Sequence, residues 1–180
     1  MEIKLPKKSR NAICIIFGVI TVVSTFAPGL YTGIWRLTHS RQIKFAGAEF
    51  IVPTGWVTMP KSWGDSSKLS LMRLPVTLFG KQGNYPLIII SQRRDSNMTN
   101  GEALARWKVL APSQFESRGY KIRNIKEFQT PTAVVCLELS SATGRPESIC
   151  FFEINRLMAS YYGDEQLMDT LYKVITSARF

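Results

Sequence analysis

The sequence predicts a mixed α+β protein: an N-terminal transmembrane helix followed by one antiparallel sheet covered by helices, an α/β/α sandwich. The first observation behind this prediction is that residues 11–35 contain no charged side chain. The second is that most apolar stretches beyond residue 41 have the length and spacing of neighbouring strands. Helical periodicity is confined to the middle of the chain and its C-terminal end.

The uncharged stretch is interpreted as a membrane anchor. Arg10 and Arg36 close it on either side, and it exceeds the roughly 20 apolar residues that cross a bilayer as a helix. Pro28 interrupts the run and predicts a kink near one interface. Tyr31 and Trp35 carry the amphipathic rings that gather at the level of the lipid headgroups.

Two alternatives to an anchor remain open. The basic residues before position 11 resemble the start of a secretory signal peptide. The most suitable cleavage point follows Ala27, but Pro28 comes next and is a poor residue after a scissile bond. The other alternative is a buried helix of a soluble protein, although such helices usually show a polar stripe. We favour an uncleaved signal anchor.

The chain then divides into four parts. Residues 1–10 form a basic N-terminal tail, residues 11–35 the transmembrane anchor, residues 36–41 a juxtamembrane linker and residues 42–180 an extracytoplasmic α+β domain. Four basic residues precede the anchor, and three follow it closely at Arg36, Arg41 and Lys44. This small excess favours a cytoplasmic N-terminus, because basic flanks stay on the cytoplasmic side. We expect a single-pass protein of the inner (plasma) membrane with a periplasmic or exterior domain.

The composition allows a hydrophobic core and indicates which charge a partner is expected to carry. The formal net charge is +10, and beyond residue 10 there remain 19 Lys and Arg against 12 Asp and Glu. A basic domain favours acidic partners such as anionic headgroups, polyanionic polymers or nucleic acid. The charges are dispersed along the chain, so a solvated surface is the favoured interpretation and nucleic acid is not expected as a partner.

Before the central helix the pattern predicts strands and loops. A hairpin is expected over residues 42–45 and 49–52, and further strands over 68–74 and 86–91. Loops are expected over 59–67 and 80–84. Trp56 follows a turn and is expected to lie beneath the sheet. The run at 86–91 is apolar at consecutive positions, which is typical of a strand covered on both faces.

The central helix has a recognisable start. Thr99 and Glu102 have the spacing of a capping box. Ala103, Trp107 and Ala111 recur at helical spacing and define the face that packs inward. Pro112 predicts an end or a kink, with a possible continuation to residue 118 before Gly119 closes the helix.

The last part of the chain reads as a meander and a helix. Strands are expected over residues 120–128, 133–139, 148–154 and 156–162, and a helix that opens at residues 163–165. If the hairpin of the middle two strands is symmetric about Thr143, Cys136 lies directly opposite Cys150. A disulfide is one outcome in an oxidising compartment, and two packed thiols are the favoured one.

Residues 50–56 (FIVPTGW) end the predicted N-terminal hairpin, and residues 175–178 (ITSA) close the predicted terminal helix. With the central helix and the meander between them, they make residues 42–178 resemble PsbP-like and DcrB-like domains. This resemblance implies an α/β/α sandwich and a tethered extracytoplasmic protein that assists a larger complex without catalysis. The chain departs from that family in having a membrane span in place of a lipid-attachment cysteine, and no functional residue of the family is matched.

No catalytic residue, cofactor or metal site is predicted. The only histidine, His39, lies in the predicted linker, and the two cysteines of the domain are too few for a structural zinc site. Glu138 and Glu153 lie in the best hairpin, where a strand end or exposed edge explains them better than an acid–base pair. An enzyme is therefore not expected; the alternative is a membrane-surface hydrolase with a dispersed active site.

The predicted function is a membrane-anchored, non-enzymatic accessory or binding domain that supports a larger envelope complex. Its partner is expected to be a membrane protein or envelope complex, with the bilayer contacted through residues 11–35, and no small-molecule substrate is expected. Trp63 lies in a polar loop, where an exposed aromatic side chain often marks a contact surface. The candidate partner surface consists of this residue and nearby bases: Trp63, Arg93, Arg94, Arg118, Lys121 and Arg123.

Overall fold

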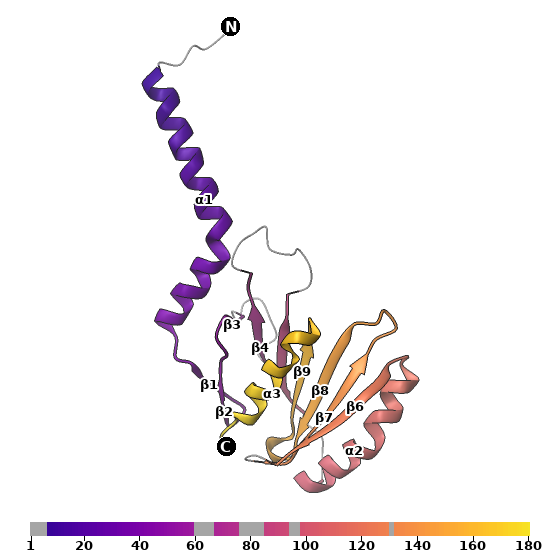
Figure 1. Ribbon diagram of the computed structural model, residues 1–180. Helices are drawn as coiled ribbons and strands as arrows, with labels where there is room; N and C mark the ends of the chain where they lie inside the picture. The colour runs from indigo at the N-terminus through magenta and orange to yellow at the C-terminus, as the bar shows by residue number, and fades with distance from the viewer. Residues whose placement is uncertain (1–6, 60–66, 76–84, 94–97, 130–131) are drawn as a thin grey trace.

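The computed structural model describes residues 7–59, 67–75, 85–93, 98–129 and 132–180. Figure 1 shows a long N-terminal helix that leads into a body of strands and two further helices. In chain order the elements are α1 (Lys7–Thr38), β1 (Gln42–Phe45), β2 (Ala48–Ile51), β3 (Trp56–Thr58), β4 (Lys68–Arg73), β5 (Leu87–Gln92), α2 (Asn100–Ser117), β6 (Lys121–Phe128), β7 (Val134–Ser140), β8 (Pro146–Phe152), η2 (Ile154–Arg156), β9 (Leu157–Tyr162), η3 (Glu165–Leu167) and α3 (Met168–Thr176). Every strand and helix predicted within these ranges is present. The loops predicted over 59–67 and 80–84 lie, apart from Met59 and Ser67, outside the described residues.

The sheet is antiparallel, which confirms the predicted fold class. Seven strands hydrogen-bond in the order β3-β4-β5-β9-β8-β7-β6, and β1 and β2 form a separate hairpin. Strand β9 inserts beside β5, so the parts of the sheet before and after α2 are joined at its centre. The β7–β8 hairpin is symmetric about Thr143, and Cys136 pairs with Cys150 as predicted. The two form a disulfide, so the interpretation as packed thiols, favoured from the sequence, is wrong.

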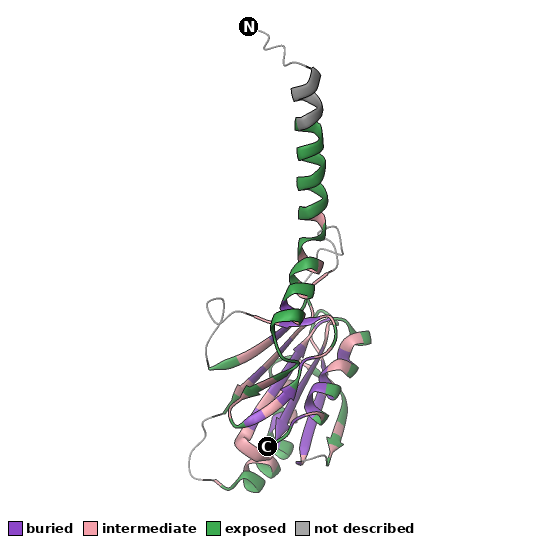
Figure 2. Cartoon of the chain, turned by 90° about the vertical axis from the view of Figure 1, so that its left-hand side faces the viewer, coloured by how far each residue is buried: buried purple, intermediate pink, exposed green. Residues whose placement is uncertain are grey.

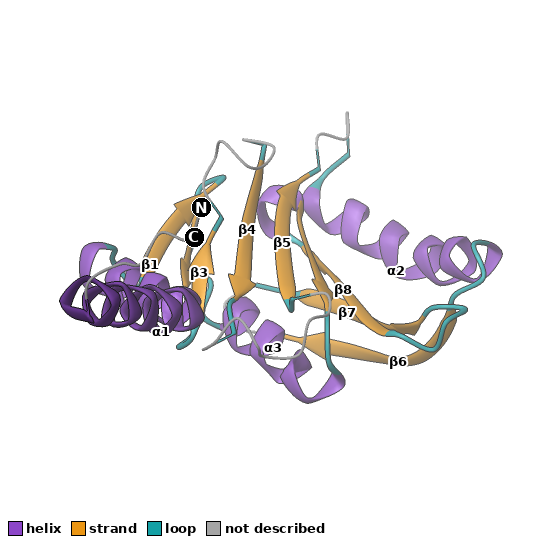
Figure 3. Cartoon of the chain, turned by 90° about the horizontal axis from the view of Figure 1, so that it is seen from above, coloured by secondary structure: helices purple, strands orange, loops and turns teal. Residues whose placement is uncertain are grey.

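Helices cover both faces of the sheet, as Figure 3 shows from above. On one face α3 and the β1–β2 hairpin pack over a core that includes Phe50, Trp56 and Tyr161, all fully buried. On the other face α2 lies over β6, β7 and β8, and buries Trp107 against Phe151. The alternation of side chains along each strand supplies both cores, because successive residues point to opposite faces.

Helix α2 begins with the predicted capping box. The Thr99 hydroxyl accepts from the Glu102 amide at 3.3 Å, and the Glu102 carboxylate accepts from the Thr99 amide at 2.8 Å. The helix continues through Pro112 to Ser117, so the proline does not end it. Gly119 then adopts φ 83°, a left-handed conformation that glycine reaches without steric cost.

Helix α1 projects from the body and is attached to it at its C-terminal end (Figure 2). It contains Pro28, ends at Thr38, and bends before it meets the domain (Figure 1). Trp35 is only 4% exposed and belongs to the larger core, while its ring stacks on His39 with centroids 4.9 Å apart. Arg36 donates a hydrogen bond to the carbonyl of Pro53. The first residues of the predicted linker are therefore helical, and they hold α1 to the domain.

Candidate functional site

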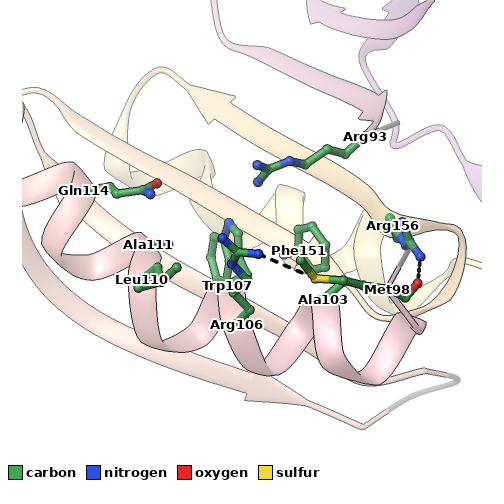
Figure 4. Close-up of a pocket in the computed structure, with 10 residues that line it drawn as sticks. All are labelled: Arg93, Met98, Ala103, Arg106, Trp107, Leu110, Ala111, Gln114, Phe151 and Arg156. Atoms are coloured by element: carbon green, nitrogen blue, oxygen red, sulfur yellow. Dashed lines mark hydrogen bonds between the residues drawn. The ribbon is translucent and has the colours of Figure 1, made fainter. Parts of the chain in front are cut away.

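A cleft of about 310 Å³ lies between α2 and the sheet (Figure 4). Its lining comes from α2 and the residues just before it, from the residue after β5, from β8 and from the turn before β9. The residues are Arg93, Met98, Ala103, Arg106, Trp107, Leu110, Ala111, Gln114, Phe151 and Arg156. We call this the arginine cleft, because three guanidinium groups from three separate segments border it.

The floor of the arginine cleft is aromatic. Trp107 stacks on Phe151 with ring centroids 5.6 Å apart and planes 18° apart. Both side chains are nearly buried, so they fix where α2 rests on the sheet. Arg106, Leu110 and Gln114 follow one another at intervals of four residues, which places them along one side of α2 beside the cleft.

Arg156 is held in place by several contacts. One of its guanidinium nitrogens donates to the carbonyl of Met98, and its Nε donates to Asn100 Oδ1 at 3.4 Å. Arg106 lies on the other side of Met98, with Nη1 3.9 Å from the thioether sulfur. The backbone amide of Arg93 donates to the carbonyl of Arg156 at 3.1 Å. These contacts join the three arginine-bearing segments around the N-terminus of α2.

The turn that carries Arg156 has an unusual backbone. Asn155 and Arg156 have φ values of 55° and 49°, a region that residues other than glycine seldom occupy. Each such residue costs about 1 kcal/mol or more, so surrounding contacts must hold it. The Asn155 side-chain amide donates to the carbonyl of Ala46 at 3.0 Å, in the β1–β2 turn. The position of Arg156 is thereby tied to both sides of the sheet.

An incompletely covered part of the sheet lies next to the cleft. Helix α2 covers β6, β7 and β8, whereas on the same face β4, β5 and β9 present apolar side chains that are only half-buried. We call these the open strip: Met72, Leu87, Ile89 and Met158. Met158 pairs with Phe151 across β8 and β9, so the strip begins at the cleft floor. The prediction that both faces of the apolar strand at 86–91 are covered is therefore only half right: Ile88 and Ile90 are fully buried, and their neighbours are not.

The structure divides the predicted partner surface. Arg93 borders the arginine cleft. Arg118, Lys121 and Arg123 lie around the end of α2 and the start of β6, and Arg118 is twelve residues, or about 18 Å of helix, beyond Arg106. Arg123 forms an ion pair with Glu165 at 2.6 Å. Trp63 and Arg94 lie outside the described residues.

Two of the three arginines of the cleft were not predicted as site residues from the sequence. Arg106 carries a detectable signal, because it adjoins Trp107 and shares a helical side with Leu110. Arg156 carries none, because its place depends on the left-handed turn at Asn155 and on the pairing of β9 with β5.

Side chains of the types used in catalysis have structural partners elsewhere in the described parts of the chain. His39 stacks on Trp35, and the two cysteines of the domain are bonded to each other. Burial opposes ionisation of Glu138, but hydrogen bonds from Lys126 and from the Tyr172 hydroxyl outweigh it and lower the pKa of its carboxyl. Within the described ranges no group of three or more His, Cys, Asp or Glu residues could hold a metal ion.

A second hollow, of about 790 Å³, lies where α1 meets the domain. Its lining is mainly apolar and comes from the C-terminal half of α1 and from the β3–β4 edge of the sheet. The residues are Phe26, Gly29, Leu30, Thr32, Gly33, Ile34, Leu37, Gly55, Arg73, Leu74 and Pro75. It continues the apolar surface of α1 onto the domain.

The fold and the cleft define a small α+β domain with a seven-stranded antiparallel sheet between helices, carried on a long apolar helix. Among solved structures the chain is similar to the solution structure of cyanobacterial PsbP (CyanoP) from Synechocystis sp. PCC 6803. The similarity covers 77% of this chain and 90% of that one, with 15% sequence identity and a TM-score of 0.44. The similar structure is a PsbP protein, one of the two kinds of domain that the sequence resembles, and no residue role is transferred. No family model matches the sequence, and no curated protein matches it.

Proposed function

We propose that this protein is a membrane-anchored, non-enzymatic binding domain that supports a larger envelope complex. The observation that carries the proposal is helix α1, whose most apolar stretch has no partner within the described parts of the chain. Within its segment Ile13–Thr38 the most apolar window of 18 residues has a mean hydropathy of 2.2 and is 0% buried. At 1.5 Å per residue these 26 residues span about 39 Å, longer than the hydrocarbon core of a bilayer.

The junction between α1 and the domain supports a role at the membrane surface. Trp35 is packed in the core, so the domain cannot move far from the end of the helix. The apolar hollow beside α1 lies at this junction, where lipid would meet the domain. In the proposed arrangement the arginine cleft belongs to a body held close to the bilayer, where other membrane proteins are within reach.

Two observations support an extracytoplasmic domain with the N-terminus in the cytoplasm. Disulfides persist in oxidising compartments and are rare in the cytosol, and the bond between Cys136 and Cys150 fits the former. The basic residues before residue 11 favour retention of that end on the cytoplasmic side. The inner (plasma) membrane, with the domain outside, satisfies both.

A binding role is supported by the structural contacts that the potentially reactive side chains make. His39 serves the helix–domain junction, and the cysteines of the domain form a cross-link. What the described surface offers instead is a cluster of arginines beside half-buried apolar residues, the composition that protein interfaces favour. Trp63 and Arg94 stay predictions as further members of the contact surface.

The proposal is tested by isolating the full-length chain, tagged after Phe180, from membranes dissolved in a mild detergent. We expect it to elute together with at least one other integral membrane protein in a fixed ratio. Trp63→Ala is made in parallel, because it tests whether the predicted loop contributes to that association. Elution of the wild-type chain alone, at the size of one copy in its micelle, would contradict the proposed role.

A further inference from the structure

We propose that the apolar hollow between α1 and the β3–β4 edge of the sheet binds one phospholipid with an anionic headgroup. The acyl chains of this lipid lie in the hollow, and its phosphate meets the arginines at the end nearest the domain. This inference rests on the proposed function, because it assumes that α1 crosses a bilayer. It adds a ligand class and a defined site to the contact between the domain and the membrane.

The hollow lies at the depth where hydrocarbon gives way to lipid headgroups. Along α1 its wall runs from Phe26 to Leu37, about 16 Å of helix. Ile13 begins the apolar segment, and Phe26 lies about 20 Å beyond it. A hydrocarbon core about 30 Å thick that begins at Ile13 ends near Gly33. The Phe26 end of the hollow is therefore among acyl chains, and the Leu37 end is among headgroups.

The walls of the hollow have the chemistry of an acyl-chain site. Phe26, Leu30 and Ile34 recur at intervals of four residues along one side, and Leu74 and Pro75, which follow β4, form the other side. The lining drawn from the described residues contains no Asp or Glu. Leu30 and Ile34 are 50% and 60% exposed, so the described parts of the domain leave them largely uncovered.

The size of the hollow favours acyl chains over a partner helix. Its volume of about 790 Å³ lies within the range of small-molecule pockets. A helix about 10 Å wide would displace roughly 1,250 Å³ over a length of about 16 Å, which is more than the hollow holds. Flexible acyl chains adapt to the hollow and supply the van der Waals contacts that a void beside the protein would lack.

Three arginines lie at the end of the hollow nearest the domain. Arg73 lines it, and a Cβ atom at Gly55 would lie 4.0 Å from Arg73 Nε. In the same turn of the chain, the carbonyl of Pro53 accepts a hydrogen bond from Arg36. Arg41 lies near enough to Arg36 for their positive charges to repel. None of the three arginines forms an ion pair within the described parts of the chain.

The contacts of Arg36 indicate that this charge is to be shared with an anion. Its Nη2 donates to Pro53, whereas its Nη1 is buried without a hydrogen-bond partner in the described parts of the chain. Burying an unpaired donor and placing two like charges together both cost free energy. A phosphate beside Arg36 and Arg41 offsets the repulsion, and it offers acceptor oxygens to the exposed side chains of Arg41 and Arg73. Because basic side chains at a membrane surface attract anionic lipids, the headgroup carries a net negative charge.

The first experiment reconstitutes the full-length chain in phosphatidylcholine vesicles that contain a small fraction of phosphatidylglycerol with a photo-reactive group in one acyl chain. After illumination, mass spectrometry locates the attached lipid. We expect label at Leu74, on the domain side of the hollow, as well as along α1. The same photo-reactive group carried by phosphatidylcholine should label Leu74 about tenfold less, because each arginine at an anionic headgroup contributes a factor of about five.

A variant of Gly33 tests whether the hollow itself is the site. Gly33 lines the hollow, and a Cβ atom there meets no atom within 4 Å, so Gly33→Leu fits and fills part of the space. We expect it to reduce the label at Leu74 about tenfold. Gly18→Leu is the matched control, because a Cβ at Gly18 is equally unobstructed and Gly18 does not line the hollow. It should leave the label within about twofold.

A paired arginine variant tests the choice of headgroup. Arg41→Gln with Arg73→Gln should bring the labelling by the two lipids to within about twofold of each other. The control is Arg118→Gln with Lys121→Gln, which removes the same charge near β6, at the opposite edge of the sheet from β3. It should leave the preference for phosphatidylglycerol unchanged.

The second experiment identifies the occupant in native membranes. A photo-reactive amino acid replaces Leu37, at the rim of the hollow, in the full-length chain in the cells that make it. We expect an adduct with the mass of one phospholipid that has an acidic headgroup. An adduct to a protein segment would mean that a partner helix occupies the hollow, and would overturn the inference.

The inference is also overturned by label confined to α1, or by equal labelling of the wild type by the two lipids. If the chain withstands an alkaline wash of its membranes in that event, the anchor of the proposed function stands and only the lipid site is wrong. If the wash releases the chain, both are wrong.

Discussion

The disulfide between Cys136 and Cys150 gives a quantitative prediction. The two residues face each other across β7 and β8, are fully buried beneath α3, and are separated by 14 positions in the sequence. Closing a loop of this length restricts the unfolded chain and stabilises the fold by about 3 kcal/mol. For a domain of this size that free energy corresponds to roughly 10 °C in the midpoint of thermal unfolding.

The perturbation is the paired substitution Cys136→Ala with Cys150→Ala, and the assay is thermal unfolding of the full-length chain in detergent. The wild type is measured with and without a reducing agent, because reduction removes the cross-link and leaves both sulfur atoms in the core. We expect the reduced wild type and the paired variant to melt at similar temperatures, both well below the oxidised protein. Cys14→Ser is the control and should change nothing, since Cys14 lies exposed on α1.

Two results would refute this reasoning. If the protein from native membranes has the mass of the fully reduced chain, the two cysteines are not bonded and the argument for an oxidising compartment is lost. If the bond is present but its reduction leaves the unfolding midpoint unchanged, the β7–β8 hairpin is ordered in the unfolded chain, and the loop-closure argument is wrong.

Further predictions concern the junction, the start of α2 and two carboxylates, of which Glu147 is buried and Glu138 half-buried. Trp35→Ala should lower the free energy of unfolding by about 3–5 kcal/mol and expose the chain near residue 39 to protease. Thr99→Ala should cost about 1 kcal/mol in denaturant unfolding, because it removes the capping box with Glu102. Glu138→Gln should destabilise at neutral pH, and the difference should fade as the pH falls through the lowered pKa of that carboxyl. Burial raises the pKa of the Glu147 carboxyl, although Arg145 and Tyr120 oppose this rise. The stability that its protonated form contributes is therefore lost as the pH rises through the raised pKa. Glu147→Gln should be neutral or stabilising at pH 7. Unfolding curves of both glutamine variants between about pH 2.5 and pH 8 check the opposite signs.

Local chemistry made most of the fold predictable. The capping box at Thr99, the apolar periodicity of residues 167–175 and the symmetric hairpin about Thr143 are set by residues close in sequence, and all three are confirmed. The sequence could not predict whether α2 ends at Pro112 or continues through it. The outcome depends on whether the packing of the whole helix on the sheet offsets the destabilising effect of the proline.

The site was harder to predict because it is assembled from distant segments. Arg93 was selected from the sequence, but its neighbours in space are Arg106 and Arg156, brought together by the pairing of β5 with β9 and the placement of α2. No residue spacing in the sequence indicates that these three arginines lie close together. The half-buried state of Leu87 and Ile89 was missed for a similar reason: the apolar run indicates a strand, but not how far a helix extends over it.

The most direct test of the central claim is an alkaline wash of native membranes followed by intact-mass measurement of the tagged full-length chain. The account predicts that the protein stays in the membrane pellet and keeps residues 1–35. It also predicts that Cys14 reacts with a water-soluble maleimide only after detergent is added. Recovery of the chain in the soluble fraction with residues 1–35 still attached would contradict the anchor, and with it the location and role proposed for the domain.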